Sequence, residues 1–435
     1  MKFNLYTFGC RLNKAESNQI FQKLLQKGFF FSSQNPDLII INSCALTKKA
    51  ENQCLQFVKK VRRENSKSFL VLTGCLASLK NLQCHKLDDN LKTFTKKTGI
   101  DLLIANNEKG QIVEKILTHI ASSSQVLSKQ KTKEAGSGRE FIKIQDGCNK
   151  FCTYCLVPFL RGCSQSIDAL QIIEQAKLAE KNGIKEIILT GVDISQYQDK
   201  EGIDLTNLIK QILQQTQNLR IRLGSIYPEA FTSEFLALYQ TPSAFAINKK
   251  DFQYRLCRHF HISLQSASDS VLQRMGRKYS VKEYLQVLGK IRQIIPDVSI
   301  TTDVIVGFPG ETNDEFATTF KNLQKMKLSK IHVFPYSERP LTKASQNHDW
   351  KKITKKTKTI RAKKLRDLSK EQEQDFIKKF LGSHLQVLLE NKDKNGFCWG
   401  YSDNYLKVKV KKLELEISKI YDFFITDTEK DYLIA

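Results

Sequence analysis

The chain has 435 residues, of which 41% are hydrophobic, so it is long enough for roughly two to four domains with buried cores. Its 69 basic and 45 acidic residues give a net charge of +24, which favours a polyanionic partner such as nucleic acid; a surface that is simply rich in lysine is the alternative. No apolar run reaches membrane-spanning length and the N-terminus lacks a signal-peptide core, so we expect a cytoplasmic protein with no membrane partner.

The first 120 residues repeat one pattern three times, namely a short apolar strand, a cysteine and a helical pattern. Strands are expected at residues 3–8, 38–41 and 69–72. The cysteines that follow them are Cys10, Cys44 and Cys75. Asn13 and Glu16 are expected to cap the first helix. Because strands and helices alternate, this N-terminal domain is predicted to be an α/β domain with a parallel sheet.

These three cysteines, the sheet-edge cysteines, are expected to meet in space. In a parallel sheet all strand-to-helix loops lie at the carboxyl edge, so thiols separated by 33 and 30 intervening residues can converge. An odd total of 11 cysteines in a chain of this kind favours metal ligation over disulfides. The pattern therefore favours a cluster at this edge. The alternative for each thiol is a buried structural role, which we expect for Cys54 and Cys84.

Residues 121–139 lack apolar periodicity and are interpreted as a linker. After the linker come three cysteines with CxxxCxxC spacing, here called the loop cysteines: Cys148, Cys152 and Cys155. This triplet can hold a four-iron cluster and leave one iron open to a small molecule, which indicates a cluster that takes part in chemistry. A zinc knuckle is the alternative, but no nearby histidine completes its four ligands.

Residues 140–345 alternate strand and helix patterns. Strands are expected at residues 141–145, 186–190, 220–224, 259–264, 299–306 and 331–334. Six strand-helix units predict a partial (β/α)6 barrel that is open enough to admit a macromolecular substrate. Residues 241–254 have no strong pattern and are expected to be an insertion.

The last part of the chain is predicted to contain a basic helix and a small β-barrel. Residues 346–384 are interpreted as a connecting helix, in which residues 351–366 include nine basic residues and no acid. Solvated helices usually mix charges of both signs, so we expect this segment to face phosphate. Residues 385–435 are predicted to form the barrel, with strands at residues 385–389, 397–401, 405–410 and 415–417.

Three segments resemble the radical S-adenosylmethionine (SAM) methylthiotransferase family, in the order in which that family has them. CNKFCTYCLVPFLRG, at residues 148–162, resembles its cluster loop, and TFGCRLNKAES, at residues 7–17, resembles its N-terminal motif. GYSDNYLKV, at residues 400–408, resembles its RNA-binding TRAM domain. The resemblance implies a radical SAM barrel, two 4Fe-4S clusters, S-adenosyl-L-methionine, a tRNA substrate, a low-potential electron donor and a sulfur source.

Within this family the chain is most similar to the branch that modifies N6-threonylcarbamoyladenosine (t6A) at tRNA position 37. The motifs LTGVDIS and MGRKYS add to that similarity. It implies that the sheet-edge cluster carries the sulfur, that one SAM methylates it, and that a second SAM yields the radical that removes hydrogen from carbon 2 of adenine. The alternatives are isopentenyladenosine in tRNA, an aspartate of a ribosomal protein, or a non-catalytic iron-sulfur RNA-binding protein.

The resemblance also implies a set of contacts with SAM: Tyr154, Thr190, Gly191, Ser225, Gln265 and Arg277. Tyr154 lies next to the third thiolate, whereas the others are expected near the carboxyl ends of barrel strands, where loops converge. Each has an ordinary alternative, such as a packing aromatic, a turn or a polar strand end, and Arg274 and Lys278 are alternatives to Arg277.

Two further features of the barrel sequence bear on the SAM pocket. GFPGET, at residues 307–312, matches a family signature and is interpreted as a turn that shapes the adenine pocket. Tyr227 precedes Pro228 at a position where the family commonly has glutamate. We therefore expect contacts near this third loop to differ from those of the family.

Overall fold

The computed structural model describes residues 1–84, 89–121, 138–240, 254–411 and 414–435. The chain forms two compact units. The N-terminal unit comprises Met1–Ala135, Asp146–Ser164 and Ser337–Gln346, and the barrel unit comprises Gly136–Gln145, Gln165–Tyr336 and Asn347–Ala435. The segment with the loop cysteines thus belongs to the same unit as the sheet-edge cysteines.

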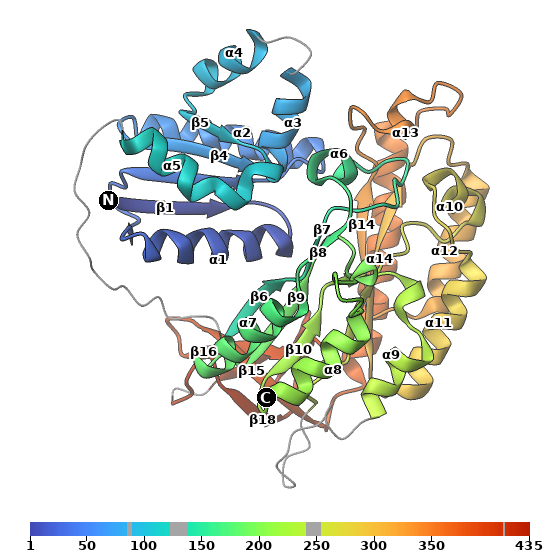
Figure 1. The fold of residues 1–435 in the computed structure, drawn as a ribbon. Helices are drawn as coiled ribbons and strands as arrows, with labels where there is room; N and C mark the ends of the chain where they lie inside the picture. Colours follow the sequence, from blue (N-terminus) through green and yellow to red (C-terminus); the bar gives the residue numbers. More distant parts are fainter. Residues whose placement is uncertain (85–88, 122–137, 241–253, 412–413) are drawn as a thin grey trace. The chain divides into compact units, whose positions relative to one another are not determined.

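The N-terminal unit is built on one parallel sheet with the strand order β2-β1-β3-β4-β5 (Figure 1). Its strands are β1 (Lys2–Thr7), β2 (Phe30–Phe31), β3 (Leu38–Ser43), β4 (Phe69–Gly74) and β5 (Leu102–Ile104). The three predicted strands are confirmed and lie side by side in the sheet. Their carboxyl ends therefore lie at one edge, as the sequence pattern required.

Helices cover both faces of this sheet because its strands carry apolar residues on both sides. One face packs against α1 (Arg11–Gln26) and α5 (Ile112–Ala121), and the other packs against α2 (Lys48–Glu64), α3 (Cys75–Cys84) and α4 (Asp89–Thr98). A 3-10 helix, η1 (Asn106–Gln111), precedes α5. The unit also contains α6 (Val157–Arg161) and α13 (Lys343–Gln346).

All six predicted barrel strands are present, in sequential order across two parallel sheets. The first sheet has the order β10-β9-β6 and the second β11-β12-β13-β14. Hydrogen bonds from Ile221 N to Arg255 O (2.7 Å) and from Cys257 N to Ile221 O (2.9 Å) connect β10 to the segment before β12. The strands are β6 (Arg139–Lys143), β9 (Glu186–Thr190), β10 (Arg220–Leu223), β11 (Ser225–Ile226), β12 (His259–Ile262), β13 (Ser299–Val306) and β14 (Lys330–Pro335). A short pair, β7 (Gln145–Asp146) and β8 (Gln165–Ser166), follows β6.

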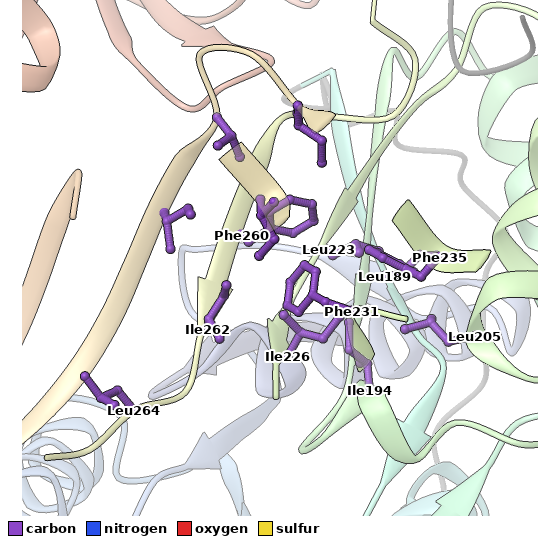
Figure 2. Close-up of a cluster of buried hydrophobic side chains, with 14 of the residues drawn as sticks. Leu189, Ile194, Leu205, Leu223, Ile226, Phe231, Phe235, Phe260, Ile262 and Leu264 are labelled. Carbon is purple, nitrogen blue, oxygen red and sulfur yellow. The ribbon is translucent and has the colours of Figure 1, made fainter. Parts of the chain in front are cut away.

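Alternation along the barrel strands separates an apolar outer layer from a polar inner one. Leu189, Leu223, Phe260 and Ile262 belong to the large buried cluster in Figure 2, together with residues of the surrounding loops and helices. The intervening strand residues include Glu186, Arg220, Arg222, His261 and Asp303. Period-2 alternation therefore directs polar side chains to the inner face of the sheet.

Helices of the barrel unit follow the strands in the expected alternation. They are α7 (Ala169–Lys181), α8 (Leu205–Gln215), α9 (Ser233–Ala237), α10 (Asp269–Met275), α11 (Val281–Ile294), α12 (Asn313–Met326) and α14 (Lys355–Lys378), with 3-10 turns η2 (Ile194–Gln196), η3 (Pro228–Ala230) and η4 (Leu238–Gln240). Capping boxes start α11, with Ser280 and Glu283, and α12, with Thr312 and Glu315.

The basic connecting segment forms α14, which packs along β14 and is part of the barrel's outer layer (Figure 1). Ala362, Leu365 and Leu368 belong to the barrel core. Near the start of the helix, Lys358 Nζ donates to Tyr336 O (3.2 Å), just after β14 ends. Near its end, Lys330 Nζ lies 2.7 Å from Glu373 Oε1, where β14 begins. The N-terminal half of α14 therefore lies at the carboxyl edge of the barrel sheet.

The C-terminal residues, for which a small β-barrel is predicted, are rich in sheet as expected and form six strands in the order β18-β15-β16-β17-β20-β19. Its strands are β15 (His384–Lys392), β16 (Phe397–Ser402), β17 (Lys407–Lys411), β18 (Ile420–Phe424), β19 (Asp427–Glu429) and β20 (Tyr432–Ile434). The strand expected at residues 415–417 is wrong, because these residues form turn and irregular structure between β17 and β18. Two apolar positions in three residues are too few to distinguish a strand from a turn.

Buried ion pairs hold the C-terminal sheet against the amino ends of the barrel strands. Glu186 at the start of β9 is completely buried between Arg139 (2.7 Å) and Arg222 (2.8 Å). Arg222 also donates to the carbonyls of Ser402, the last residue of β16, and Asp403, in the turn after it. The C-terminal sheet is thus attached at the end of the barrel opposite to the edge where the SAM contacts were expected.

Several sequence predictions concern residues outside the described part of the chain. The linker at 121–139 and the insertion at 241–254 fall almost entirely there, as does the Cys84 side chain. Among the helices that the structure describes, none combines the length and the apolar character needed to cross a membrane.

Candidate active site

The sheet-edge cysteines occupy equivalent positions in the N-terminal sheet. Cys10 directly precedes α1, Cys44 follows β3 and Cys75 begins α3, directly after β4. Cys10 is exposed, whereas Cys44 and Cys75 are buried. Gly9 allows close approach in this region, since a Cβ built on it would lie 2.8 Å from Cys44 Cβ and its φ is +100°.

The protein environment opposes ionisation of the Cys10 and Cys44 thiols when no metal is bound. Burial raises the pKa of Cys44 to about 12, and the negative charges of Cys75 and Cys10 act in the same direction. Loss of hydration also raises the pKa of Cys10, while the Arg161 guanidinium lowers it. Metal ligation requires thiolates, so binding at this edge would release protons.

Cys54 lies beside this group but has a structural role. Its side chain is fully buried, and its Sγ accepts a hydrogen bond from Cys44 N at 3.5 Å. Burial raises the pKa of Cys54 as well. The expected assignment of Cys54 to the buried core is confirmed.

The loop cysteines lie between β7 and α6, in a loop whose backbone is directed toward the sulfurs. Lys150 N donates to Cys148 Sγ (3.5 Å), and Val157 N donates to Cys155 Sγ (3.4 Å). Amide donors to cysteine sulfur are a common feature of iron-sulfur sites, because they stabilise the thiolate and raise the reduction potential of the cluster. The same loop holds Phe151, which is half exposed, in the left-handed region (φ +46°).

No set of three or more His, Cys, Asp or Glu side chains in the described ranges already has the arrangement of a metal site. The donor chemistry nevertheless fits iron-sulfur clusters, since each triplet offers three thiols and the loop adds amide donors to two of them. The assignment of the six cysteines as ligands therefore stays a prediction.

Of the predicted SAM contacts of the barrel, Thr190, Gly191, Ser225 and Gln265 lie near the carboxyl ends of strands, whereas Arg277 follows α10. Thr190 is the last residue of β9 and is buried, and Gly191 follows it. A Cβ on Gly191 would lie 2.8 Å from Gln145 Oε1 and 2.9 Å from Gln145 O. Only glycine fits here, because the 191–193 loop closes over Gln145, whose Oε1 accepts from the amides of Val192 and Asp193.

Ser225 and Gln265 mark the next two strand ends. Ser225 begins β11 in register with His261. Gln265 adopts φ +77°, which is rare for residues other than glycine, and its backbone exchanges hydrogen bonds with β13 through Asp303 O and Ile305 N. Strained backbone at a strand end is typical of functional positions, so this conformation is consistent with the predicted functional role of Gln265.

Tyr227, which stands where the family commonly has glutamate, packs against Arg277. The Arg277 guanidinium lies over the Tyr227 ring, 4.9 Å from its centroid, in cation-π geometry. Tyr227 N donates to Ser195 Oγ (2.7 Å), which connects this contact to the loop after β9. At the position where the family commonly has a carboxylate, this chain thus has an aromatic ring, and that ring contacts Arg277. Tyr154, the remaining predicted contact, is partly buried in the loop of the N-terminal unit.

The GFPGET segment forms a turn that α14 braces. Glu311 is buried, accepts from Gly307 N (2.7 Å) and forms an ion pair with Arg361 (2.6 Å). Gly307 has φ +68°, and a Cβ there would lie 2.4 Å from Lys358 Cγ. The predicted turn is confirmed, whereas its contact with adenine stays a prediction. Arg361 supports the turn and does not face solvent, although it belongs to the basic segment.

Two polar groups were missed by the sequence interpretation. Asn13 and Glu16 do not cap α1; Cys10 is the N-cap, without a side-chain cap, and both side chains turn inward to meet Arg161. On the inner face of the barrel, His261 lies 3.3 Å from Asp303. Alternation in β12 and β13 was a usable signal for the second group, but nothing in local sequence joins Asn13 to Arg161.

Comparisons with known proteins agree with the geometry. The sequence pattern of the radical SAM superfamily matches residues 142–323, and that of Uncharacterized protein family UPF0004 matches residues 2–95. The structure of the radical S-adenosylmethionine methyltransferase TsrM from Kitasatospora setae has the same fold, with a TM-score of 0.56 and 12% identity over 79% of this chain and 75% of that one.

Similar sequences cover nearly the whole chain. Threonylcarbamoyladenosine tRNA methylthiotransferase MtaB of Thermotoga maritima is 36% identical over 92% of this chain and 89% of its own length. MtaB of Aquifex aeolicus is 32% identical over 94% and 96%. A tRNA-2-methylthio-N(6)-dimethylallyladenosine synthase of Endomicrobium trichonymphae is 32% identical over 94% and 93%. The chain belongs to the radical S-adenosylmethionine methylthiotransferase family.

Proposed function

We propose that this protein inserts a methylthio group at carbon 2 of N6-threonylcarbamoyladenosine at tRNA position 37, by radical SAM chemistry. The observation that carries the proposal is the pair of thiol triplets, one at a parallel-sheet edge and one in a CxxxCxxC loop, in a chain that aligns over almost its full length with proteins named for this activity. Two triplets are what the reaction needs, because it both generates a radical and supplies sulfur.

The six cysteines are proposed to hold two 4Fe-4S clusters. The loop cysteines would bind the cluster whose open iron holds SAM, and the sheet-edge cysteines would bind the auxiliary cluster. When bound, these groups supply the electron for cleavage of SAM and the sulfur for insertion. The residues of the chain hold the thiolates in place, since the amides of Lys150 and Val157 already point at Cys148 and Cys155.

Binding of SAM is proposed to involve the strand ends of the barrel. Thr190 and Gly191 would contact the methionine amine, Ser225 and Gln265 the ribose and carboxylate, and Arg277 the carboxylate. Glycine at position 191 lets the loop after β9 close over Gln145, which fills the space that a Cβ would take, and the cation-π contact with Tyr227 would keep Arg277 oriented. Tyr154 would contribute to adenine binding next to the loop cysteines.

The N-terminal half of α14 is proposed to bind the tRNA backbone. Lys355, Lys356, Lys363 and Lys364 are exposed, whereas Arg361 is buried in its pair with Glu311. This half of the helix lies at the carboxyl edge of the barrel sheet, the edge that carries the proposed SAM contacts. A polyanion bound there would bring its modified base toward the reacting groups.

The reaction also requires a low-potential electron donor and a source of sulfur, which we propose are separate partners. A tRNA substrate places the proposed activity in the cytoplasm. The second candidate substrate is isopentenyladenosine in tRNA, favoured by the 32% identity with the dimethylallyladenosine synthase of Endomicrobium trichonymphae.

A substrate comparison tests the proposal. Anaerobically reconstituted protein with SAM and a chemical reductant is given tRNA that carries t6A37 or, separately, isopentenyladenosine at position 37, and digested nucleosides are analysed by mass spectrometry. We expect the methylthio product from t6A only, and none from protein in which Cys10 is replaced with alanine. A product from isopentenyladenosine alone would favour the second candidate, and no product from either would contradict both.

A further inference from the structure

The short helix α6 (Val157–Arg161) forms part of the wall around the sheet-edge cysteines. In sequence it belongs to the CxxxCxxC segment, since it starts two residues after Cys155. Its neighbours in space, however, are those of the N-terminal sheet: Leu156 and Leu160 are buried in the same core cluster as Cys44 and Cys75. Residues of α6 are therefore fixed relative to the sheet-edge cysteines.

Arg161, the last residue of α6, is buried and completely engaged in charged and polar contacts. Its side chain is only 2% exposed. Nη1 donates to Glu16 Oε1 (2.8 Å) and to Asp146 Oδ1 (2.9 Å), and Nη2 donates to Asn13 Oδ1 (2.7 Å) and Glu16 Oε2 (3.2 Å). The planar guanidinium thus holds three side chains in a fixed geometry, which lysine could not do.

Asn13 transmits this geometry to the first two cysteines. Its Nδ2 donates to Phe8 O (2.7 Å) and Ser43 O (3.0 Å), which lie just before Cys10 and Cys44 in the chain. Cys10 Sγ lies 4.0 Å from Asn13 Oδ1, the same oxygen that accepts from Arg161. Arg161 therefore determines which way the Asn13 amide faces, and Asn13 connects the loops that carry two of the three thiols.

A second amide connects α6 to the third cysteine. Asn106 Nδ2 donates to Leu160 O (3.0 Å) and lies 3.8 Å from Cys75 Sγ. Cys10 and Cys75 are thus each connected to α6 through one residue, and Cys44 is connected to it through Asn13 and the Ser43 carbonyl. The network also contains a second buried cation, because Lys109 Nζ contacts Glu16 Oε2 (2.6 Å) and Asn42 Oδ1 (3.2 Å).

The charges of this network suit an anionic ligand set. Glu16 is shared by two buried cations, and the other carboxylate, Asp146, is partly exposed, with 22% of its side chain accessible. Solvent screens Asp146 more than it screens the buried groups, so the local field is positive on the cysteine side. Three thiolates bound to iron carry negative charge that such a field stabilises.

We propose that Arg161 is a positioning residue for the auxiliary cluster: it orients Asn13 between Cys10 and Cys44 and supplies buried positive charge beside the thiolates. The inference rests on the proposed function in one respect, namely that the sheet-edge cysteines hold a cluster. It predicts that Arg161 slows the loss of iron from this site and raises the reduction potential of the cluster, although Arg161 belongs to the segment of the other triplet.

The test uses the full chain with the loop cysteines replaced by alanine, so that only the sheet-edge site can hold iron. In this background Arg161→Gln is compared with Arg161→Lys, and Arg62→Gln is the matched control. Arg62 also makes several hydrogen bonds and an ion pair, with Asp101, in the N-terminal unit, and its partners Gly99, Ser66, Ser68 and Asp101 lie outside the cysteine loops. Iron loss to a chelator and the midpoint potential from an EPR-monitored redox titration are measured, with thermal unfolding as a check of folding.

We expect Arg161→Gln to lose iron about tenfold faster, the low end of the range for residues that support metal ligands, and to have a lower midpoint potential. Arg161→Lys should keep a nearly parental midpoint potential but lose iron faster. Lysine retains the positive charge but cannot hold Asn13, Glu16 and Asp146 as the planar guanidinium does. This variant decides the matter if Arg161→Gln does not fold. Parental values for both variants, or equal effects of Arg62→Gln, would overturn the inference while leaving the cluster assignment intact. A background protein that binds no iron would overturn the assignment and the inference with it.

Discussion

Replacing Lys355, Lys356, Lys363 and Lys364 with glutamine tests whether α14 binds the tRNA backbone. All four side chains are exposed, and glutamine keeps much of the helix propensity, so the fold should be retained. A protein that neutralises phosphates releases counterions, and log K falls by roughly 0.7 to 0.9 per log unit of salt for each phosphate. If each lysine contacts one phosphate, the variant's salt slope should be shallower by about 3.

The slope converts into a measurable difference in affinity. Between about 50 and 200 mM salt, the parent should lose roughly 50- to 150-fold more affinity for tRNA than the variant. Filter binding or fluorescence anisotropy at several salt concentrations measures this, and cleavage of SAM without RNA should stay unchanged.

A second quadruple variant controls for the loss of net charge. Lys181, Lys210, Lys282 and Lys290 are exposed on α7, α8 and α11, and changing them to glutamine removes the same four charges elsewhere on the barrel unit. This control should change the salt slope of tRNA binding far less, because lysines that only add to the net charge steer association without contacting phosphates. Equal slopes for the parent and the α14 variant would contradict phosphate contacts by these four lysines and leave the C-terminal sheet as the RNA platform.

Three further outcomes are expected. Replacement of the loop cysteines with alanine should halve the iron of reconstituted protein and abolish SAM cleavage, whereas iron that falls to zero or does not change would contradict two independent sites. Replacement of the sheet-edge cysteines should end sulfur insertion but leave SAM cleavage measurable; parallel loss of both activities in protein that keeps its loop cluster would show that the roles are not divided in this way. Glu186→Gln should destabilise the fold by about 3 kcal/mol in urea unfolding at pH 7, because Arg222 then stays buried without its carboxylate while Arg139 keeps only Glu390. A change within error would contradict a stabilising role for the buried Glu186 carboxylate.

Glu186 also predicts a dependence of stability on pH. Burial alone would raise the pKa of this carboxyl, but Arg139 and Arg222 outweigh it and lower the pKa from 4.5 to about 2. The carboxylate is therefore stabilised by folding above pH 4.5, and this contribution is lost as the pH falls from about 4.5 to about 2. The difference in unfolding free energy between parent and Glu186→Gln should narrow across that interval, which urea titrations at several pH values measure.

The fold was predictable where one periodicity governed a segment. Alternation of strand and helix located the strands before Cys10, Cys44 and Cys75 and those of the barrel, because apolar strands buried on both faces leave a strong local signal. The strand predicted at residues 415–417 was wrong because the local signal there is weak: a few apolar residues in a turn resemble a short strand. Bounds of β17 and β18 depend on pairing with strands that are distant in sequence.

The site was only partly predictable because its contacts are not local. The CxxxCxxC spacing is local and was recognised, as were the polar strand ends at Thr190 and Gln265. The network around Arg161 joins residues more than 140 positions apart, so Asn13 and Glu16 were assigned to helix capping when they in fact bind the guanidinium. The cation-π contact between Arg277 and Tyr227 was not predictable for the same reason. The sequence shows Tyr227 where the family commonly has glutamate, but it does not show which side chain Tyr227 contacts.

The most direct test of the account is the mass spectrum of tRNA nucleosides from a strain that lacks this gene. We expect loss of the 2-methylthio derivative of N6-threonylcarbamoyladenosine with accumulation of the unmodified t6A, and restoration by the intact gene but not by the gene with its sheet-edge cysteines replaced by alanine. Unchanged methylthio-t6A in the deletion strain, or loss of the isopentenyladenosine derivative in its place, would contradict it.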